Sequence, residues 1–274
     1  MRLLRRSAGR AIQFEAFGVT AEVAYGGREL EAQVREVLPP GWVATRGGPL
    51  SGRFGLEQGR SGDFAVSAGD RPLIEGVTLS VALGLLDSEI RLLVATMAPD
   101  LVFVHAGVVA VDRRALLVPG QSFTGKTTLV RALVGAGATY YSDEYAVLDR
   151  DGMVHPYPRR LSIRATDSSP AEEPHVHELG GVAGESAADV TIVAITRYRA
   201  GETWNPQPLS NGAGALALLE NTVPARARPQ DALQVISRAL RRARVLTGDR
   251  GEANEAANAL LADLAPSAGR GTHP

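Results

Sequence analysis

Apolar residues recur at helical spacing in several stretches of the chain. The longest stretch covers residues 78–97, where apolar side chains follow one another at intervals of three or four positions before Pro99 ends the pattern. That spacing places them on one face of an amphipathic helix. The residues concerned are Leu79, Leu83, Leu86, Ile90, Leu93 and Met97. Shorter patterns of the same kind predict helices over 29–37, 211–219, 231–240 and 252–264.

Other stretches alternate apolar and polar residues, or are short apolar runs bounded by turn residues, and these predict strands. They lie at 12–14, 19–23, 53–56, 64–66, 71–74, 101–110, 115–118, 139–141, 145–148, 153–155, 190–195 and 244–246. We expect Ala106-Gly107 to divide the run 101–110 into two strand segments. The polar stretch 166–186, with its Gly and Pro residues, is typical of a long loop.

The order of these elements predicts an α/β protein in two domains. Residues 1–97 are expected to form a small N-terminal α+β accessory domain, and residues 98–265 a larger domain with a mixed β-sheet. The end of the chain, 266–274, is expected to be a disordered tail.

Composition narrows the class of protein. Hydrophobic residues make up 45% and charged residues 22%, as in ordinary globular proteins. A net charge of −1 gives no support for binding nucleic acid or an anionic membrane. The absence of cysteine excludes disulfides and thiolate chemistry and fits a cytoplasmic location. The apolar segment 81–104 is interrupted by Asp87, Glu89, Arg91 and Asp100, so we expect no membrane span there.

A phosphate-binding loop is the clearest chemical signal. Gly120, Gly125, Lys126 and Thr127 fit the pattern G-x-x-x-x-G-K-[ST], between an apolar strand run and the start of a helical pattern over 127–134. Glycines let successive backbone amides turn towards phosphate oxygens, and the helix N-terminus adds its positive dipole end. Lys126 supplies a charge to the β- and γ-phosphates, and the Thr127 hydroxyl is suited to ligate Mg²⁺.

The predicted ligands are therefore ATP and Mg²⁺. The candidate nucleotide-binding residues are Gly120, Gln121, Ser122, Phe123, Thr124, Gly125, Lys126, Thr127 and Thr128. The alternative is a glycine-rich turn between strand and helix that carries a lysine by chance.

Phosphoryl transfer also needs carboxylates and cations near the γ-phosphate. Asp143 and Glu144 end the strand that follows the phosphate-loop helix, where an α/β sheet binds its ligands; a solvated acidic pair is the equal alternative. Arg159 follows Pro158 and could face phosphate, or lie on the surface. His105 lies in an apolar run, where a histidine is more often a core residue than a catalytic one.

A dense group of arginines lies near the C-terminus. A solvated face is the simpler interpretation of this pattern, and a docking surface for an acidic partner is the alternative. Its members are Arg238, Arg241, Arg242, Arg244 and Arg250.

Together these motifs resemble the HPr kinase/phosphorylase C-terminal domain and its HPr-kinase-like relatives, whose P-loop fold is related to that of PEP carboxykinase. The shared elements are His105-Ala106-Gly107, the phosphate loop, a helix that ends at Gly137, and a strand that ends in paired acids. The resemblance covers residues 102–264.

The resemblance implies a role for each matched residue. Lys126 would hold phosphate, and Thr127 and Asp143 would hold Mg²⁺. Glu144 would accept the proton of the acceptor hydroxyl, and His105 would be the active-site histidine, so the implied catalytic residues are His105, Lys126, Asp143 and Glu144.

The sequence departs from the family pattern at two places. The second acid is Glu144 where HPr kinases have Asp, which lengthens the side chain by one methylene. The family's Leu-Glu-x-Arg-Gly segment is not found, and residues 177–181 are only a poor match.

The expected function is that of an ATP-dependent kinase. It would transfer the γ-phosphoryl group, with Mg²⁺, to a Ser-type or other hydroxyl of a peptide, protein or small molecule. The expected partners are the nucleotide and this acceptor, with no nucleic acid and no membrane. The sequence leaves open whether the chain forms a homo-oligomer. One alternative is a non-catalytic ATP-binding regulatory or scaffold module. Another is a PEP-carboxykinase-like transfer, for which we find no extended substrate-site motif.

Overall fold

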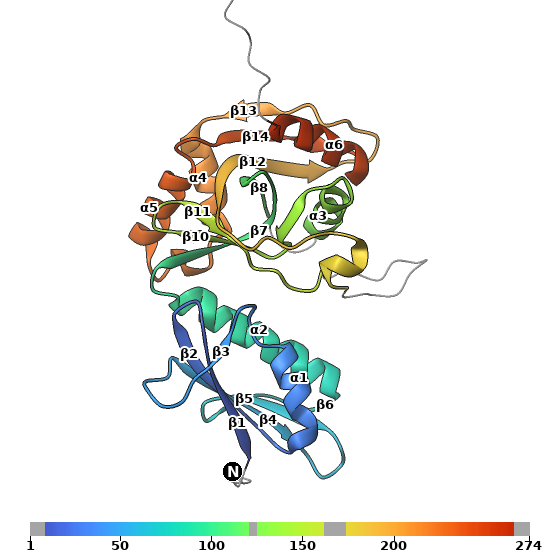
Figure 1. Cartoon of the computed structure of the whole chain (residues 1–274). Helices are drawn as coiled ribbons and strands as arrows, with labels where there is room; N and C mark the ends of the chain where they lie inside the picture. The colour runs from blue at the N-terminus through green and yellow to red at the C-terminus, as the bar shows by residue number, and fades with distance from the viewer. Residues whose placement is uncertain (1–8, 121–124, 162–173, 266–274) are drawn as a thin grey trace, which may run out of the picture. The chain divides into compact units, whose positions relative to one another are not determined.

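The computed structural model describes residues 9–120, 125–161 and 174–265. The chain divides into two compact units, Met1–Asp100 and Leu101–Pro274, and each is built on its own mixed β-sheet (Figure 1). The protein therefore has a mixed α/β fold. The predicted tail 266–274 lies outside the described residues. Within the described ranges, no helix is both long and apolar enough to cross a lipid bilayer.

The first unit is a sheet covered by helices on one face. Its strands are hydrogen-bonded in the order β3-β1-β2-β4-β5-β6, with β2 and β4 parallel and the other pairs antiparallel. The strands are β1 (Arg10–Ala16), β2 (Val19–Tyr25), β3 (Val43–Ala44), β4 (Gly52–Gln58), β5 (Phe64–Ala68) and β6 (Arg71–Val77). The helices are η1 (Arg28–Leu30), α1 (Glu31–Glu36) and α2 (Leu79–Met97).

Alternation along the strands produces the core of this unit. Every second residue of β2 is buried, and Val34 of α1 and Leu86 of α2 join these side chains in one cluster. The predicted helix over 78–97 is confirmed: the Thr78 side chain caps it by accepting a hydrogen bond from the amide of Val81.

The second unit carries the phosphate-loop motif. Its strands are hydrogen-bonded in the order β11-β10-β7-β8-β12-β14-β13; β9 pairs with β7, and β11 also pairs with β12. The strands are β7 (Leu101–Val111), β8 (Arg114–Pro119), β9 (Thr139–Ser142), β10 (Tyr145–Asp149), β11 (Met153–His155), β12 (Ala188–Tyr198), β13 (Gln207–Leu209) and β14 (Arg244–Arg250). The helices are α3 (Lys126–Gly135), η2 (Val176–Leu179), α4 (Asn211–Glu220), η3 (Val223–Ala225), α5 (Pro229–Ala239) and α6 (Ala253–Leu264).

Strand β7 runs through Ala106 and Gly107 without the predicted break. Both residues pair with β8, Ala106 opposite Pro119 and Gly107 opposite Val118. Gly107 marks a close approach of a helix, because a Cβ there would lie 2.5 Å from Cγ2 of Val130 on α3. The glycine therefore serves packing, and the strand continues past it.

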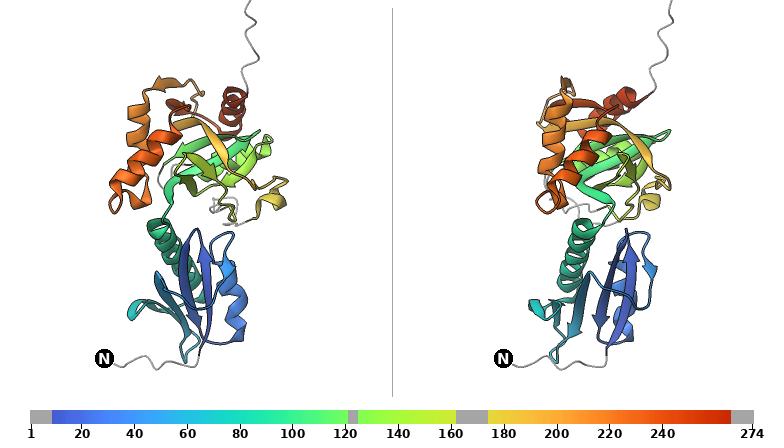
Figure 2. Two further views of the ribbon diagram at one scale, coloured as in Figure 1. Left: turned by 60° about the vertical axis from the view of Figure 1, so that its left-hand side comes forward. Right: turned by 90° about the vertical axis from the view of Figure 1, so that its left-hand side faces the viewer.

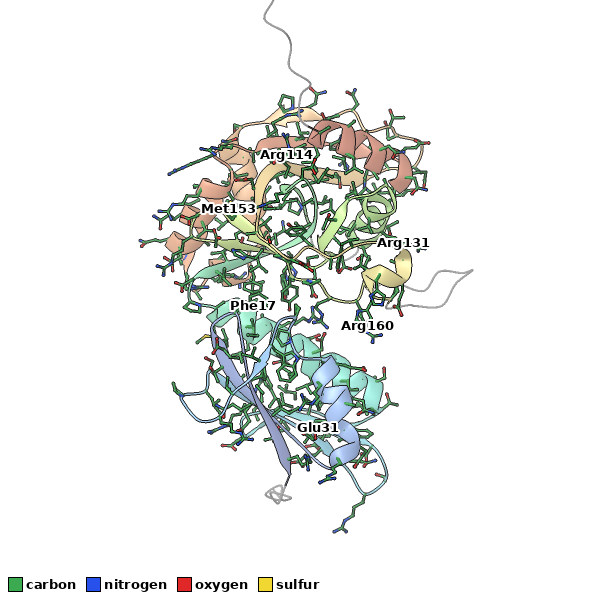
Figure 3. The ribbon with its side chains drawn as sticks, viewed as in Figure 1. Phe17, Glu31, Arg114, Arg131, Met153 and Arg160 are labelled. Atoms are coloured by element: carbon green, nitrogen blue, oxygen red, sulfur yellow. The ribbon has the colours of Figure 1, made fainter. Side chains whose placement is uncertain are left out.

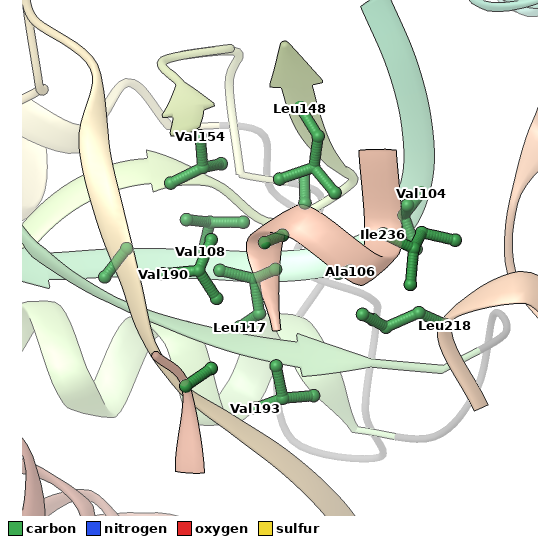
Figure 4. Packing of buried hydrophobic residues seen from close by; sticks show 14 of the residues in the cluster. Val104, Ala106, Val108, Leu117, Leu148, Val154, Val190, Val193, Leu218 and Ile236 are labelled. Carbon is green, nitrogen blue, oxygen red and sulfur yellow. The ribbon is translucent and has the colours of Figure 1, made fainter. Parts of the chain in front are cut away.

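Helices cover this sheet on both faces (Figures 1 and 2). On one face, Leu218 of α4 and Ile236 of α5 pack against the strands in the cluster drawn in Figure 4. On the other face, Leu133 of α3 and Leu260 of α6 pack against a second cluster of strand residues. Two apolar layers thus fix the central strands between helix pairs.

The central strands β8, β12 and β14 are parallel to one another. Parallel strands end at the same edge of a sheet, so Pro119, Tyr198 and Arg250 lie at the edge where the phosphate-loop motif begins. This is the edge at which α/β folds bind ligands.

Candidate active site

The phosphate-loop motif lies between β8 and α3. Gly120 follows β8, and its amide donates to the backbone carbonyl oxygen of His105 on β7 across 3.2 Å. Gly125 is the N-cap of α3 and has a φ of 78°, a left-handed conformation that favours glycine. Lys126 and Thr127 occupy the first turn of the helix and are half-buried, while Thr128 is exposed. The candidate residues Gln121, Ser122, Phe123 and Thr124 lie outside the described residues.

The motif threonine meets the first of the paired acids. The Thr127 hydroxyl donates to Oδ2 of Asp143 across 3.0 Å, although the two residues are 16 positions apart. Asp143 is 7% exposed. The contact joins the start of α3 to the end of β9.

A serine shapes the turn that carries the two acids. The Ser142 hydroxyl accepts hydrogen bonds from the amides of Glu144 (3.0 Å) and Tyr145 (2.9 Å). Serine commonly supports such turns by bonding to its own neighbouring backbone. The bend ends β9, leads into β10, and holds Asp143 and Glu144 between the two strands.

The second carboxylate oxygen of Asp143 is held by a tyrosine that sequence reasoning missed. The Tyr140 hydroxyl donates to Oδ1 of Asp143 across 2.9 Å and lies 3.1 Å from the carbonyl oxygen of Arg159. Burial, followed by the Asp143 carboxylate, raises the pKa of the Tyr140 phenol far above its ordinary value. The phenol therefore stays protonated and remains a donor. The Arg159 backbone is thus part of this cluster, whereas Arg160 is exposed and lies at the surface (Figure 3).

Strand pairing brings the predicted histidine close to the turn that carries the acids. His105 on β7 is opposite Tyr145 on β10, and their ring centroids are 4.7 Å apart. The amide of the next residue, Ala106, donates to the carbonyl oxygen of Glu144 across 3.0 Å. The amide of His105 itself donates to the carbonyl oxygen of Asn221, across 2.8 Å. Backbone bonds therefore connect His105, the Glu144 turn and Gly120.

Aromatic packing holds Tyr145 in this position. Phe103, Tyr145 and Tyr157 form a cluster of edge-to-face contacts, with centroids 5.5 to 6.0 Å apart. Such contacts are favourable because the positive edge of one ring meets the negative face of another. The ring that lies beside His105 is therefore held by two other aromatic rings.

Thr127 and Asp143 together have the donor chemistry that Mg²⁺ requires. Hydroxyl and carboxylate oxygens suit this hard cation, which is usually held by one or two protein groups together with phosphate oxygens and water. Among the described residues, no group of three or more His, Asp or Glu side chains is arranged to hold a metal. The oxygen pair fits Mg²⁺ supplied together with a nucleotide.

Arg250 also lies at this site, and we predicted its environment incorrectly. We assigned it to a solvated arginine patch, but it is 2% exposed, whereas Arg241, Arg242 and Arg244 are exposed. Its Nη2 donates to the carbonyl oxygen of Gly125 across 3.1 Å. The missed signal was the length of β14, which we predicted only over 244–246 and which continues to Arg250.

No protein-family model matches the chain, and none of the curated protein sequences is significantly similar to it.

Proposed function

We propose that the protein is an HPr-kinase-like, P-loop kinase that uses ATP and Mg²⁺ to phosphorylate a hydroxyl group. The observation that carries the proposal is the 3.0 Å contact between the Thr127 hydroxyl and Asp143. It joins the threonine of the motif, at the start of α3, to a carboxylate at the end of β9. A chance glycine-rich turn would give no reason for such a contact, whereas phosphoryl transfer needs both groups at one metal.

In this proposal the phosphate loop binds the nucleotide. The amides at the start of α3 and the Lys126 ammonium group hold the β- and γ-phosphates. Thr127 and Asp143 hold Mg²⁺, which when bound neutralises charge on the same oxygens. Tyr140 orients the Asp143 carboxylate, and Ser142 orients the turn that carries it.

Glu144 takes part in the chemical step. The acceptor hydroxyl gives its proton to the Glu144 carboxylate while its oxygen forms a new bond to the γ-phosphorus. The bond between that phosphorus and the β,γ-bridging oxygen breaks, and ADP leaves with the electron pair. His105, linked to the Glu144 turn through the Ala106 amide, lies beside the same turn.

The proposal leaves the acceptor as a class, namely a hydroxyl on a peptide, protein or small molecule. The test is incubation of the whole chain with Mg²⁺, γ-labelled ATP and each class of acceptor in turn. Label should move to one class, the transfer should require Mg²⁺, and Lys126→Ala should abolish it. A chain that binds no ATP would overturn the proposal. Tight Mg·ATP binding without transfer would favour the non-catalytic ATP-binding module.

A further inference from the structure

A buried cation lies at the start of the phosphate-loop helix. Arg250 ends β14, and its guanidinium donates from Nη2 to the carbonyl oxygen of Gly125 (3.1 Å) and from Nη1 to that of Gly251 (3.2 Å). Gly125 is the N-cap of α3, so the guanidinium is fixed to the residue from which the helix begins. The side chain also lies over the Tyr198 ring, with Cζ 5.5 Å from the ring centroid.

Burial makes this position costly for a cation. It lowers the pKa of Arg250, whereas Tyr198 and the Glu252 carboxylate act in the opposite direction, and arginine keeps its charge in proteins. Its hydrogen bonds to the described residues both go to carbonyl groups, and Nε has no partner among those residues. The N-terminus of a helix is the positive end of its dipole, where a cation is disfavoured. Lys126 adds a further positive charge in the first turn of the same helix.

Close packing also determines the contact between Gly125 and Arg250. A Cβ on Gly125 would lie 2.7 Å from Nη2 of Arg250, and the left-handed φ of Gly125 would strain any other residue. Two features therefore require glycine at position 125: the left-handed backbone conformation and the guanidinium group that packs against it. Movement of Arg250 would release the residue that sets the direction of the first helical amides.

We propose that Arg250 is a positioning residue for the phosphate loop: it holds the Gly125 carbonyl group and so sets the affinity for the nucleotide's phosphates. This inference rests on the proposed function, because it assumes that the loop binds a nucleotide. It assigns Arg250 an indirect role, through Gly125. The β-phosphate is common to ADP and ATP, so an effect through the loop should be the same for both nucleotides.

The test compares Arg250→Gln and Arg250→Lys with the parent chain. Calorimetry gives the affinities for Mg·ATP and Mg·ADP, and thermal unfolding without nucleotide gives stability. Arg250→Gln should weaken both affinities by the same factor, about 10- to 100-fold, the value of a charge-assisted hydrogen bond. Arg250→Lys keeps the charge but loses the two-carbonyl bridge, so it should fall between. The change also removes hydrogen bonds to two carbonyl groups, so the melting temperature without nucleotide is measured to show that Arg250→Gln stays folded at the temperature of the binding experiment.

Arg244→Gln is the matched control, since Arg244 begins the same strand and is exposed. It should leave both affinities unchanged. Unchanged affinities in Arg250→Gln would overturn the inference alone, as would a lower melting temperature with normal binding. Loss of ATP affinity with ADP affinity intact would also overturn it, because Arg250 would then act on the γ-phosphate. If Arg250→Gln does not fold, Arg250→Lys decides by the same criteria. A parent chain that binds neither nucleotide would overturn the proposed function and this inference with it.

Discussion

The side chains of Tyr140 and Asp143 meet across 2.9 Å, with the phenol donating to Oδ1 of the carboxylate. The other oxygen, Oδ2, accepts from the Thr127 hydroxyl. Asp143 is therefore held by one donor from the strand before it and one from the phosphate-loop helix. A carboxylate fixed at both oxygens has little rotational freedom, and preorganised groups of this kind are what metal sites and phosphoryl transfer need.

Tyr140→Phe should weaken the response to Mg²⁺. The change removes the hydroxyl and keeps the buried ring, so Asp143 loses the donor that holds its Oδ1. Loss of a group that orients a metal ligand typically lowers metal affinity by about 10-fold or more. The Mg²⁺ concentration that half-saturates ATP binding should rise accordingly. Tyr141→Phe is the control, because the Tyr141 hydroxyl donates to Ser186 instead. Equal Mg²⁺ requirements in both variants would exclude the orienting role.

Tyr140 should also make the fold sensitive to alkaline pH. Its pKa in the folded protein is raised above the ordinary value of tyrosine, which is about 10, first by burial and then by Asp143. Above that value the unfolded chain loses the proton while the folded chain keeps it, so stability falls as pH rises. The slope is up to about 1.4 kcal/mol per pH unit for one proton.

Tyr140→Phe should therefore reduce this alkaline slope. Chemical denaturation at about pH 8 and again at about pH 11 measures the effect, and the lower pH serves as the internal reference because Tyr140 keeps its proton there in the folded and in the unfolded chain. The free energy of unfolding of the variant, relative to that of the parent chain, should be higher at about pH 11 than at about pH 8. A difference that is the same at both values would contradict a raised pKa for Tyr140.

Regular periodicity was enough to predict much of the fold. The apolar residues of 78–97 recur at strict helical spacing, and α2 covers Leu79–Met97. The break expected at Ala106-Gly107 was wrong because glycine was taken as a turn signal. Gly107 instead lies where Val130 of α3 approaches the strand, a tertiary contact that has no local signature.

The candidate site could be predicted only in part, for a similar reason. The phosphate loop, Asp143 and Glu144 could be predicted because they follow one another in the sequence at the distances of a known motif. The contact between Thr127 and Asp143 depends on how α3 packs beside β9, which spacing alone does not give. Arg250 was placed on a solvated face because it belongs to a dense group of arginines, and its burial follows from the extension of β14 to the phosphate-loop edge.

Lys126→Ala should abolish Mg·ATP binding and leave the fold intact. The ammonium group supplies charge to the phosphates, and Lys126 lies in the first turn of α3, where alanine is an excellent helix former. Calorimetry measures the affinity and circular dichroism the fold. Arg131→Ala is the control, since Arg131 lies on the exposed side of the same helix (Figure 3). If Lys126→Ala kept the parent affinity, the loop would not be a nucleotide site.

Asp143→Asn should act through the metal. The amide keeps the size of the side chain but removes the negative charge that Mg²⁺ would meet. Its single oxygen can replace only one of the two carboxylate oxygens that accept from Tyr140 and Thr127. The Mg²⁺ concentration needed for turnover should rise, and ATP binding measured at saturating Mg²⁺ should recover. A variant whose loss is not relieved at any Mg²⁺ concentration would instead identify Asp143 as the base.

Glu144→Gln should act on the chemical step. Glutamine matches glutamate in size but cannot take a proton, so kcat should fall by about 10²–10⁴-fold, the usual contribution of a general base. Affinity for Mg·ATP should hardly change, because the base addresses the acceptor hydroxyl and not the nucleotide. Single-turnover kinetics with calorimetry on the same sample separates the two quantities. Glu185→Gln, a change at an exposed glutamate, should leave both as they are.

Parent-like kcat in Glu144→Gln together with a large loss in Asp143→Asn would reverse the two roles. Parent-like turnover in both variants would mean that the paired acids take no part in transfer, and that the contact between Thr127 and Asp143 serves the fold alone.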